Sequence, residues 1–536
     1  MKKLTWVIWG LSASCLTVPV LALTTSVGSE GIDALRLHKP PYNLFGRKIA
    51  LGQVEIGRPG QFGLDKSVSK NRSIALAGVF QGNQPAKSNK GVDPHAYNVA
   101  GVMVSNDKGF QGVAPGARLY SSAVGSIKGM GQPEECLSAQ HIALQNGNDV
   151  RAINFSFGEP LSRDPRPEPV LDGKALLTLC VDWSSRVHNV LYAIAGNQGK
   201  GGIPIPTDNF NGMNVAFSSR RGEIFRKLDV SNLVAINQSM TARLSGKELN
   251  LGPRRTISIV APGNRISLLN PNGEIKKVTG TSFATPHVTG TVALLQEFGD
   301  RTLAKQKKLP SSQKVKVAWS LDSRRHEVMK AVLLNSSEKI KDDGNGLKLG
   351  MTRTLIDKQN KDWLDSDAYK DAAIPLHTQM GTGHLNAFRA YQQFSAGQWS
   401  PEKAVPAIGW DYRAIFAGTS ADYTLAKPLQ KGSFVSVTLA WDRLVELGDT
   451  NKNGKYDKGE IFRDRGLNNL DLHLVKADGK DKNNRSTCAS VSRVDSVEHI
   501  FCPVPEDGNY KISVKFKNSI NEPTQPYALA WWTASK

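Results

Sequence analysis

A serine in the segment GTSFATPHVTG, which runs from Gly280 to Gly290, is the residue best placed to act as a nucleophile. Ser282 follows a Gly-Thr turn and precedes small residues and Pro286, a residue that can open a helix. A serine at a helix N-terminus lies where backbone dipoles stabilise developing negative charge. The segment therefore makes Ser282 a candidate nucleophile.

A second chemical pattern lies downstream, in DTNKNGKYDKGE. Its spacing matches the twelve-position EF-hand loop, in which oxygen ligands recur around a glycine turn. A strand-like segment rather than a helix precedes it, so we expect an isolated calcium loop with a structural role; an ordinary polar turn is the alternative. Gly454 stands at the turn, and the expected ligands are Asp449, Asn451, Asn453, Asp457 and Glu460, with the backbone carbonyl of Lys455.

The elements that must position Ser282 alternate between strand-like and helix-like segments over residues from about 49 to 300. Apolar runs that end in small or polar residues predict strands at KIALGQVEIG, ARLYSSAVG, VRAINFSFG, NVLYAIAGN and ISIVAPG. NVAGVMVSN, LSAQHIALQNG and TPHVTGTVALLQEFG predict helices. This alternation predicts an α/β fold with a mainly parallel sheet and helices on both faces. Sites in such sheets lie beyond the carboxyl ends of the strands.

The chain changes character after residue 395. GTGHLNAFRAYQQF predicts the last helix of the first domain, and WSPEKAVPAIGW has the composition of a linker. VSVTLAW, LDLHLV, YKISVKF and YALAWW predict short strands between Gly, Pro, Asn and Asp clusters. We therefore expect a first domain over residues 40–395 and an all-β sandwich over residues 405–536.

The serine segment resembles the serine motif of the subtilisin-like proteases, the subtilases, and three upstream segments resemble further motifs of that family. HAYNVAGVMVS resembles the histidine motif, which implies that His95 is the general base. YAIAGNQG resembles the motif of the oxyanion-hole asparagine, which implies that Asn197 stabilises the tetrahedral intermediate. AINFSFG resembles the strand that lines the substrate cleft, which implies that Ser156, Phe157 and Gly158 pair with an extended peptide.

Each of these residues also has a purely structural interpretation. A lone histidine before a helix is usually structural, Asn197 could be a turn residue, and the segment from Ser156 to Gly158 could be a core strand. The agreement of several motifs in one order favours the functional interpretation. The resemblance covers roughly residues 40–395 and implies a serine endopeptidase of the subtilisin fold.

The orienting acid departs from the family pattern. The first family strand ends in aspartate, but the matching stretch IALGQVEIGRPG places Glu55 there. Glutamate keeps the charge and adds one methylene, so the backbone must lie about 1.5 Å farther from the histidine. Asp65 and Asp93 are the alternative acids, although Asp93 lies only two residues before His95.

The order acid, histidine, serine is that of subtilisin-like enzymes and differs from that of trypsin-like enzymes and α/β-hydrolases. The resemblance implies peptide-bond hydrolysis through an acyl-enzyme on Ser282, with no cofactor for the chemistry and polypeptides as substrates. Two rivals stay open. One is a weak or inactive peptide-binding pseudo-peptidase, which the Glu55 departure supports. The other is a surface-binding protein that acts through its sandwich.

The chain is strongly basic, with 68 Lys and Arg against 48 Asp and Glu and a formal net charge of +20. Such a charge suits an anionic surface or polymer, or simply a solvated surface. No nucleic-acid-binding signature accompanies it, and we expect no nucleic-acid partner and a monomer.

The N-terminus predicts export. Lys2 and Lys3 precede a long apolar run, and Val20 and Ala22 are small residues suited to a cut after Ala22, so we expect residues 1–22 to form a signal peptide; an uncleaved anchor is the alternative. We expect a secreted, periplasmic or cell-surface protein. Four cysteines follow, and local pairing predicts disulfides Cys136–Cys180 and Cys488–Cys502. Four unpaired, buried thiols are the alternative.

Overall fold

The structure is a computed structural model that describes residues 24–125, 131–196, 205–229, 252–308, 319–477 and 486–535. Its first part is built on a ten-stranded sheet with the order β12-β8-β7-β6-β5-β1-β4-β2-β3, and β9 pairs with β7. The strands are β1 (Ala50–Glu55), β2 (Leu76–Gln81), β3 (Gln84–Pro85), β4 (Arg118–Ala123), β5 (Val150–Phe155), β6 (Leu191–Ala195), β7 (Met213–Arg221), β8 (Ile224–Leu228), β9 (Ile259–Pro262) and β12 (Thr354–Ile356). From β2 to β7 the sheet is parallel, whereas the β2–β3 and β7–β8 pairs are antiparallel.

Helices cover both faces of this sheet, and side-chain alternation along β1 explains why. Leu51 packs in the hydrophobic cluster that includes residues of α3 and α9, whereas Ala50 and Val54 pack with residues of α4 and α6. Because successive side chains of a strand point to opposite faces, the two helix pairs lie on opposite sides of the sheet. The four helices are α3 (Pro94–Val104), α4 (Gln132–Ala143), α6 (Leu176–His188) and α9 (Thr281–Lys308).

Smaller elements complete this α/β domain. The hairpin strands are β10 (Ile266–Leu269) and β11 (Ile275–Val278); the helices are α1 (Thr24–Val27), α2 (Leu35–His38), α5 (Gln145–Asn148), α10 (His326–Asn335), α11 (Asp367–Lys370) and α12 (Ala387–Ser395); and 3-10 turns span Leu161–Arg163, Leu321–Arg324 and Trp363–Asp365.

The C-terminal part is a sandwich of two antiparallel four-stranded sheets, in the orders β13-β22-β15-β20 and β14-β21-β18-β19. Its strands are β13 (Ile408–Phe416), β14 (Ser420–Thr424), β15 (Phe434–Trp441), β18 (Asn469–Lys476), β19 (Ser486–Ser490), β20 (Val497–Pro503), β21 (Tyr510–Asn518) and β22 (Thr524–Thr533). The Cys488–Cys502 disulfide joins β19 of one sheet to β20 of the other.

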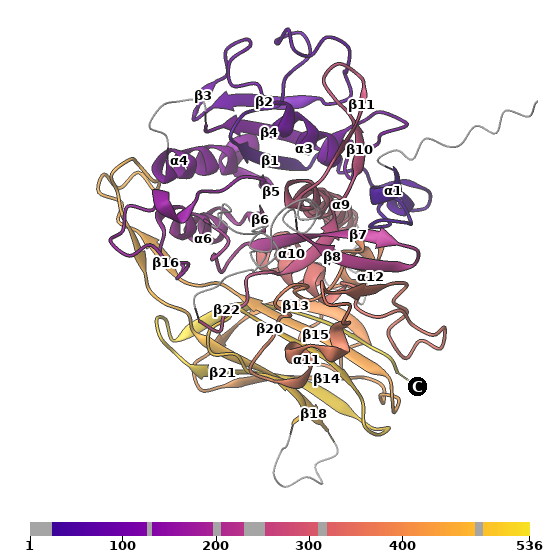
Figure 1. Ribbon diagram of the computed structural model, residues 1–536. Helices are drawn as coiled ribbons and strands as arrows, with labels where there is room; N and C mark the ends of the chain where they lie inside the picture. Colours follow the sequence, from indigo (N-terminus) through magenta and orange to yellow (C-terminus); the bar gives the residue numbers. More distant parts are fainter. Residues whose placement is uncertain are drawn as a thin grey trace, which may run out of the picture.

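The sandwich packs directly under the α/β domain (Figure 1), with α10 and α12 against β13, β15 and β22. A buried ion pair crosses the boundary: Arg443, just after β15, lies 2.5 Å from Asp182 of α6. Arg443 also donates to the carbonyl of Gly173 at 2.9 Å. The two parts therefore share a polar contact that excludes water.

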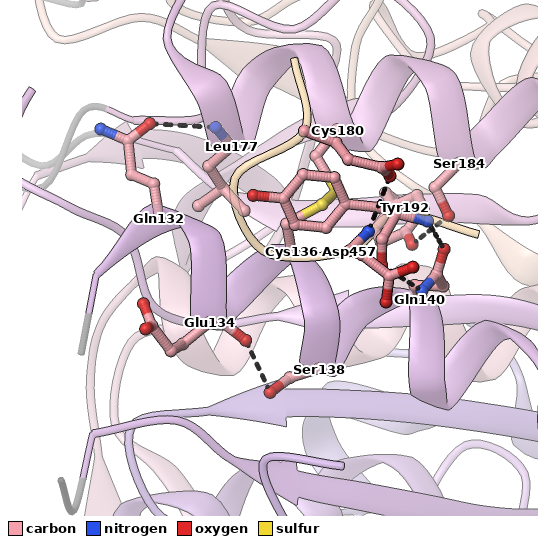
Figure 2. Close-up of a disulfide and its surroundings, with 12 residues drawn as sticks. Gln132, Glu134, Cys136, Ser138, Gln140, Leu177, Cys180, Ser184, Tyr192 and Asp457 are labelled. Carbon is pink, nitrogen blue, oxygen red and sulfur yellow. Dashed lines mark hydrogen bonds between the residues drawn. A yellow bond between two sulfur atoms is a disulfide. The ribbon is translucent and has the colours of Figure 1, made fainter. Parts of the chain in front are cut away.

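A two-stranded arm of the sandwich, β16 (Val445–Leu447) and β17 (Phe462–Asp464), reaches α6 of the α/β domain. Between these strands, Tyr456 is buried beside the Cys136–Cys180 disulfide, which joins α4 to α6. Gln140 of α4 donates to the Tyr456 carbonyl at 3.1 Å and accepts from its N–H at 2.6 Å. Figure 2 shows the disulfide with Gln140 and Asp457 beside it.

The predicted architecture, a mainly parallel sheet with helices on both faces followed by an all-β sandwich, is confirmed. Both predicted disulfides are present. One local expectation is wrong: α9 begins at Thr281, so Pro286 lies inside the helix rather than at its start. The predicted signal segment 1–22 lies outside the described residues. Among the described residues, no helix is long and apolar enough to span a membrane.

Candidate active site

The end of β1 and the start of α3 bring Glu55 and His95 together. Gln53 and Glu55 share the face of β1 that meets α3, and the Gln53 amide donates to the Ala96 carbonyl at 2.9 Å. Asp93 is the N-cap of α3, and its carboxylate accepts the His95 backbone N–H at 2.9 Å. These contacts place His95 Nδ1 3.4 Å from Glu55 Oε2.

Burial governs the electrostatics of this pair. The Glu55 side chain is 1% exposed and that of His95 is 37% exposed. Burial raises the pKa of the Glu55 carboxyl, and the His95 ring opposes the rise. Burial alone lowers the pKa of His95, but the charge of Glu55 and its hydrogen bond outweigh it, so that the pKa of His95 is raised. Both shifts favour a proton held on the pair.

The contact is longer than a strong charge-assisted hydrogen bond of about 2.7–2.9 Å. Neither Glu55 carboxylate oxygen has a well-formed hydrogen bond within the described part of the chain. A buried carboxylate without a hydrogen bond is costly. Catalytic hydrogen bonds are often long in ligand-free structures and tighten when substrate binds.

Ser282 is the second residue of α9, and the turn before it is fixed by backbone contacts. Gly280 has φ +145°, a conformation that favours glycine, and its N–H donates to the Gly263 carbonyl at 2.8 Å. The Thr281 hydroxyl donates to the Gly196 carbonyl, at the end of β6, at 3.0 Å. The nucleophile candidate thus lies at the carboxyl edge of the sheet.

Pro286 explains a polar contact around Ser282. Proline has no N–H, so it leaves the carbonyl four residues earlier, that of Ser282, without its helical partner. The Ser156 hydroxyl donates to this carbonyl at 2.9 Å, and the Ser282 hydroxyl lies 3.4 Å from the Ser156 carbonyl. The end of β5 and the start of α9 are therefore tied together at the nucleophile.

His95 lies beside this turn: its ring centroid is 5.4 Å from the ring centroid of Phe283, the residue that follows Ser282. Among the hydrogen bonds of the described residues, none joins His95 to Ser282. The structure thus brings Glu55 and His95 into contact and places Ser282 close by, with its hydroxyl turned toward Ser156.

The two alternative acids have other partners. Asp65 forms a two-point ion pair with buried Arg58, at 2.7 and 2.8 Å. Asp93 caps α3 through the His95 backbone N–H rather than through the imidazole. Of the three carboxylates considered, only Glu55 faces the His95 ring in an ion-pair contact.

The predicted substrate wall follows β5 directly. Ser156, Phe157 and Gly158 are all buried, and Phe157 packs on Phe155 with ring centroids 4.9 Å apart. Ser156 lies at the nucleophile, as described above. Asn197 lies outside the described residues.

The sequence reasoning missed Asp93 as the residue that orients the start of α3. The signal was present in Asp93-Pro94, because aspartate is favoured at an N-cap and proline at the first helical position. It also missed the contact between Ser156 and the Ser282 carbonyl, which depends on Pro286 and on residues 126 positions apart.

The second candidate site is the loop between β16 and β17. Asp449 accepts the backbone N–H groups of Asn453 and Gly454 at 3.2 and 2.7 Å. Glu460, at the other end, accepts the backbone N–H groups of Thr450 and Asp457 at 2.7 and 3.0 Å. Both carboxylates therefore accept hydrogen bonds from the backbone of the loop itself.

The remaining donors of this loop lie close to them. The side-chain amides of Asn451 and Asn453 both reach Asp457 Oδ2, at 2.7 and 2.6 Å. An all-oxygen set of carboxylate and amide groups around a glycine turn is the type of site that calcium prefers. The residue types of the loop, with the backbone carbonyl of Lys455, are those of a calcium site, and calcium binding stays a prediction.

A mainly parallel α/β sheet that carries an acid, a histidine and a serine at its carboxyl edge, in that chain order, defines the class of protein. The model of the subtilase family matches residues 52–353, more than half of the chain. The chain therefore belongs to the subtilase family. The sandwich lies outside the matched residues.

Individual relatives are distant. The chain is 29% identical over 224 residues to the major intracellular serine protease of Bacillus subtilis (strain 168), covering 41% of this chain and 59% of that protein. It is 26% identical over 236 residues to subtilisin Savinase of Lederbergia lenta, covering 44% and 74%. A solved structure, the prenylagaramide maturation protease PagA, covers 65% of this chain and 94% of its own, with 19% identity and a TM-score of 0.41. Less than two thirds of the first relative is thus matched.

Proposed function

We propose that this protein is an exported serine endopeptidase that hydrolyses peptide bonds through an acyl-enzyme on Ser282. The observation that carries the proposal is the contact between Glu55 and His95 at 3.4 Å, beside the α9 turn that holds Ser282. Membership of the subtilase family supports the same reaction class.

In the proposed reaction, His95 Nε2 takes the proton of the Ser282 hydroxyl as the oxygen attacks a peptide carbonyl. Glu55 holds Nδ1–H, which fixes the tautomer and stabilises the imidazolium that forms. His95 then gives the proton to the leaving amine, and water hydrolyses the acyl-enzyme by the same route in reverse. The Ser282 hydroxyl, which lies 3.4 Å from the Ser156 carbonyl, must first turn toward His95.

The oxyanion is assigned to the Ser282 backbone N–H and the Asn197 amide. Ser282 occupies the first turn of α9, where N–H groups lack helical partners and the helix dipole favours negative charge. Asn197 follows Gly196, whose carbonyl is bound by Thr281. One side-chain donor of this kind contributes about 3 kcal/mol of transition-state stabilisation; that magnitude was measured in subtilisin itself.

Two further parts of the proposal concern the environment of the protein. The protein is exported by residues 1–22 into an oxidising compartment. The two disulfides support this, because such bonds persist outside the cytoplasm. The loop from Asp449 to Glu460 binds calcium, which orders the arm that docks on α4 through Gln140 and Tyr456. Calcium takes no part in the chemistry of this proposal.

A catalytically weak peptide-binding protein is the second candidate. The observation that favours it is the state of Glu55, which is fully buried, has a raised pKa and lacks a well-formed hydrogen bond among the described residues. A neutral Glu55 would not stabilise the imidazolium.

Hydrolysis of casein by the purified protein and by Ser282→Ala separates the two candidates. The proposal expects the wild type to cleave casein and the variant to lose activity while keeping its melting temperature. Undiminished activity of Ser282→Ala overturns the assignment of the nucleophile, and an inactive wild type favours the second candidate.

A further inference from the structure

Exposed basic side chains gather around the hairpin of β10 and β11. None of them forms an ion pair with any described residue, and together they define what we call the basic face: Lys70, Arg72, Lys108, Arg265, Lys276 and Lys277. Two carboxylates lie among them, and both have other partners. Asp107 accepts backbone N–H groups, and Glu274 accepts the side-chain amide of Asn270. The basic face therefore carries an excess of positive charge.

Two hollows, one at each end of the hairpin, give this face its shape. The hollow at the base, of about 590 Å³, is lined by Arg265 and Lys277. The hollow at the tip, of about 390 Å³, is lined by Lys70, Arg72 and Lys108. Cations therefore border recesses at both ends of the hairpin, and these recesses can admit anionic groups.

Two apolar side chains are exposed beside the hollow at the tip. Ile275, the first residue of β11, is 52% exposed, and it pairs with Leu269, which lines that hollow. Phe62 is 40% exposed and lies under the Arg72 guanidinium, whose central carbon is 4.2 Å from the ring centroid. Apolar side chains among cations are typical of a surface that binds a membrane, because buried apolar area and attraction to anionic lipids act together there.

The N-terminal helix α1 lies on the same side of the α/β domain as the hairpin (Figure 1), and its Ser26 lines the hollow at the base. Ser26 Oγ is hydrogen-bonded to His287 Nε2 at 3.0 Å, and Arg353 donates to the Ser29 carbonyl at 2.6 Å. These contacts fix α1, and one residue separates it from the predicted signal segment 1–22. A chain still joined to that segment in a membrane would present the basic face to the lipid headgroups.

We propose that the basic face docks on a membrane surface that contains anionic lipids. This inference goes beyond the proposed peptidase function and does not depend on it. The cations gain from the negative potential of such a surface, while Ile275 and Phe62 enter its interfacial layer. An acidic polysaccharide offers the same charges, but it would leave the two apolar side chains uncovered. The observations therefore favour lipid.

Cosedimentation with vesicles tests the proposal on the chain from residue 23 onward, which contains every described residue. One set of vesicles contains phosphatidylglycerol and phosphatidylcholine in equal parts, and the other contains phosphatidylcholine alone. We expect binding to the anionic vesicles and much weaker binding to the neutral ones. Binding should be lost in about 1 M salt, where the screening length falls to about 3 Å.

Variants locate the effect on the basic face. Lys70→Gln combined with Lys277→Gln should weaken binding about 25-fold, since each basic residue near such a surface contributes about fivefold in affinity. Ile275→Ala should weaken it severalfold without changing its sensitivity to salt. Lys403→Gln combined with Lys427→Gln is the matched control, because these lysines are also exposed but lie in loops beside β13 and β14 of the sandwich. The control should bind as the parent protein does, and all variants should keep its melting temperature.

The outcomes separate the docking surface from its rivals. Equal binding to both kinds of vesicle, or binding to neither, overturns the proposal. Retention on polygalacturonate without vesicle binding also overturns it and assigns the face to an acidic polymer. Equal weakening in the test and control variants would show that net charge, rather than this face, drives binding.

Casein cleavage, measured in parallel without vesicles, keeps this proposal distinct from the proposed function. An inactive protein that binds anionic vesicles supports the docking surface and overturns the peptidase. An active protein that ignores them overturns the docking surface and leaves the peptidase standing.

Discussion

Glu55 is the last residue of β1, and its carboxylate must reach His95 from the fixed end of a strand. The extra methylene of glutamate brings the oxygen to 3.4 Å from His95 Nδ1 with the side chain fully buried. At this scale the proposed activity depends on one carboxylate that the family pattern would supply as aspartate.

Substitution of Glu55 tests that dependence. Glu55→Gln should lower kcat by several powers of ten, because replacing the orienting acid by its amide costs about 10⁴-fold in a serine protease of another fold. Glu55→Asp should cost about a hundredfold, since it opens a gap of ~1.5 Å. Steady-state kinetics on one peptide measures both. Near-normal turnover of Glu55→Gln, with loss of activity in Asp93→Asn, would show that the acid is wrongly assigned.

The pH dependence of kcat/KM should report the environment of His95. The base must be neutral to accept the serine proton, so activity rises with pH through the pKa of the free enzyme. Glu55 raises the pKa of His95 against the effect of burial, so the midpoint should lie above about 6.5, the ordinary histidine value. In Glu55→Gln the residual activity should show a lower midpoint, because the anion is gone. An unchanged midpoint would contradict the pairing.

Much of the candidate site could be predicted from the sequence through its resemblance to the subtilase motifs. Ser282, His95 and Glu55 stand in segments with recognisable neighbours, and the contact between Glu55 and His95 follows from the end of one strand and the start of one helix. The contact between the Ser156 hydroxyl and the Ser282 carbonyl could not be predicted. It joins residues 126 positions apart, at the end of β5 and the start of α9.

The helices and strands determine where the site residues lie. α9 begins at Thr281 and contains Pro286, which frees the Ser282 carbonyl for Ser156. The strands with clear apolar runs were predictable, but β2 was not. One of its residues is exposed and the others are half-buried, so it lacks the alternation of a strand with one buried face. The order of the strands in the sheet could not be predicted from the sequence either, because neighbouring strands such as β1 and β4 are not consecutive along the chain.

The loop between β16 and β17 gives the prediction at this scale. A chelator should lower the melting temperature of the wild type by several degrees, because a ligand that binds only the folded state stabilises it. Asp449→Ala combined with Glu460→Gln should remove the sensitivity to chelator. Glu446→Gln, on the neighbouring strand and paired with Arg465 at the surface, is the control that should keep it. Identical melting of the wild type with and without chelator would rule out the calcium loop.

The whole molecule is held together by contacts between parts that are distant in sequence. Arg443 and Asp182 are 261 residues apart and meet in a buried ion pair, while the arm with Tyr456 docks beside the Cys136–Cys180 disulfide. The sequence indicated two domains, but not that they pack through α10, α12 and a buried charge pair. Neither of the two contacting surfaces has a sequence pattern that would predict its partner.

Breaking the pair should therefore destabilise the molecule. Arg443→Ala leaves buried Asp182 without its ion-pair partner, with only the backbone N–H groups of Phe210 and Asn211 donating to it, and breaking a buried pair in this way costs about 3–5 kcal/mol of the free energy of unfolding. Lys458→Ala, which removes an exposed pair with Glu134 across the same boundary, should cost at most about 1 kcal/mol. Denaturant unfolding measures both variants. Equal destabilisation by the two substitutions would show that the buried pair does not hold the domains together.

The central claim is that Ser282 is a competent nucleophile, and covalent labelling tests it most directly. A fluorophosphonate probe reacts only with a serine activated by its base, so the wild type should be labelled, and mass spectrometry should place the adduct on Ser282. The label should be absent from Ser282→Ala and strongly reduced in Glu55→Gln. A folded wild-type protein that remains unlabelled, or an adduct at another residue, would contradict the account.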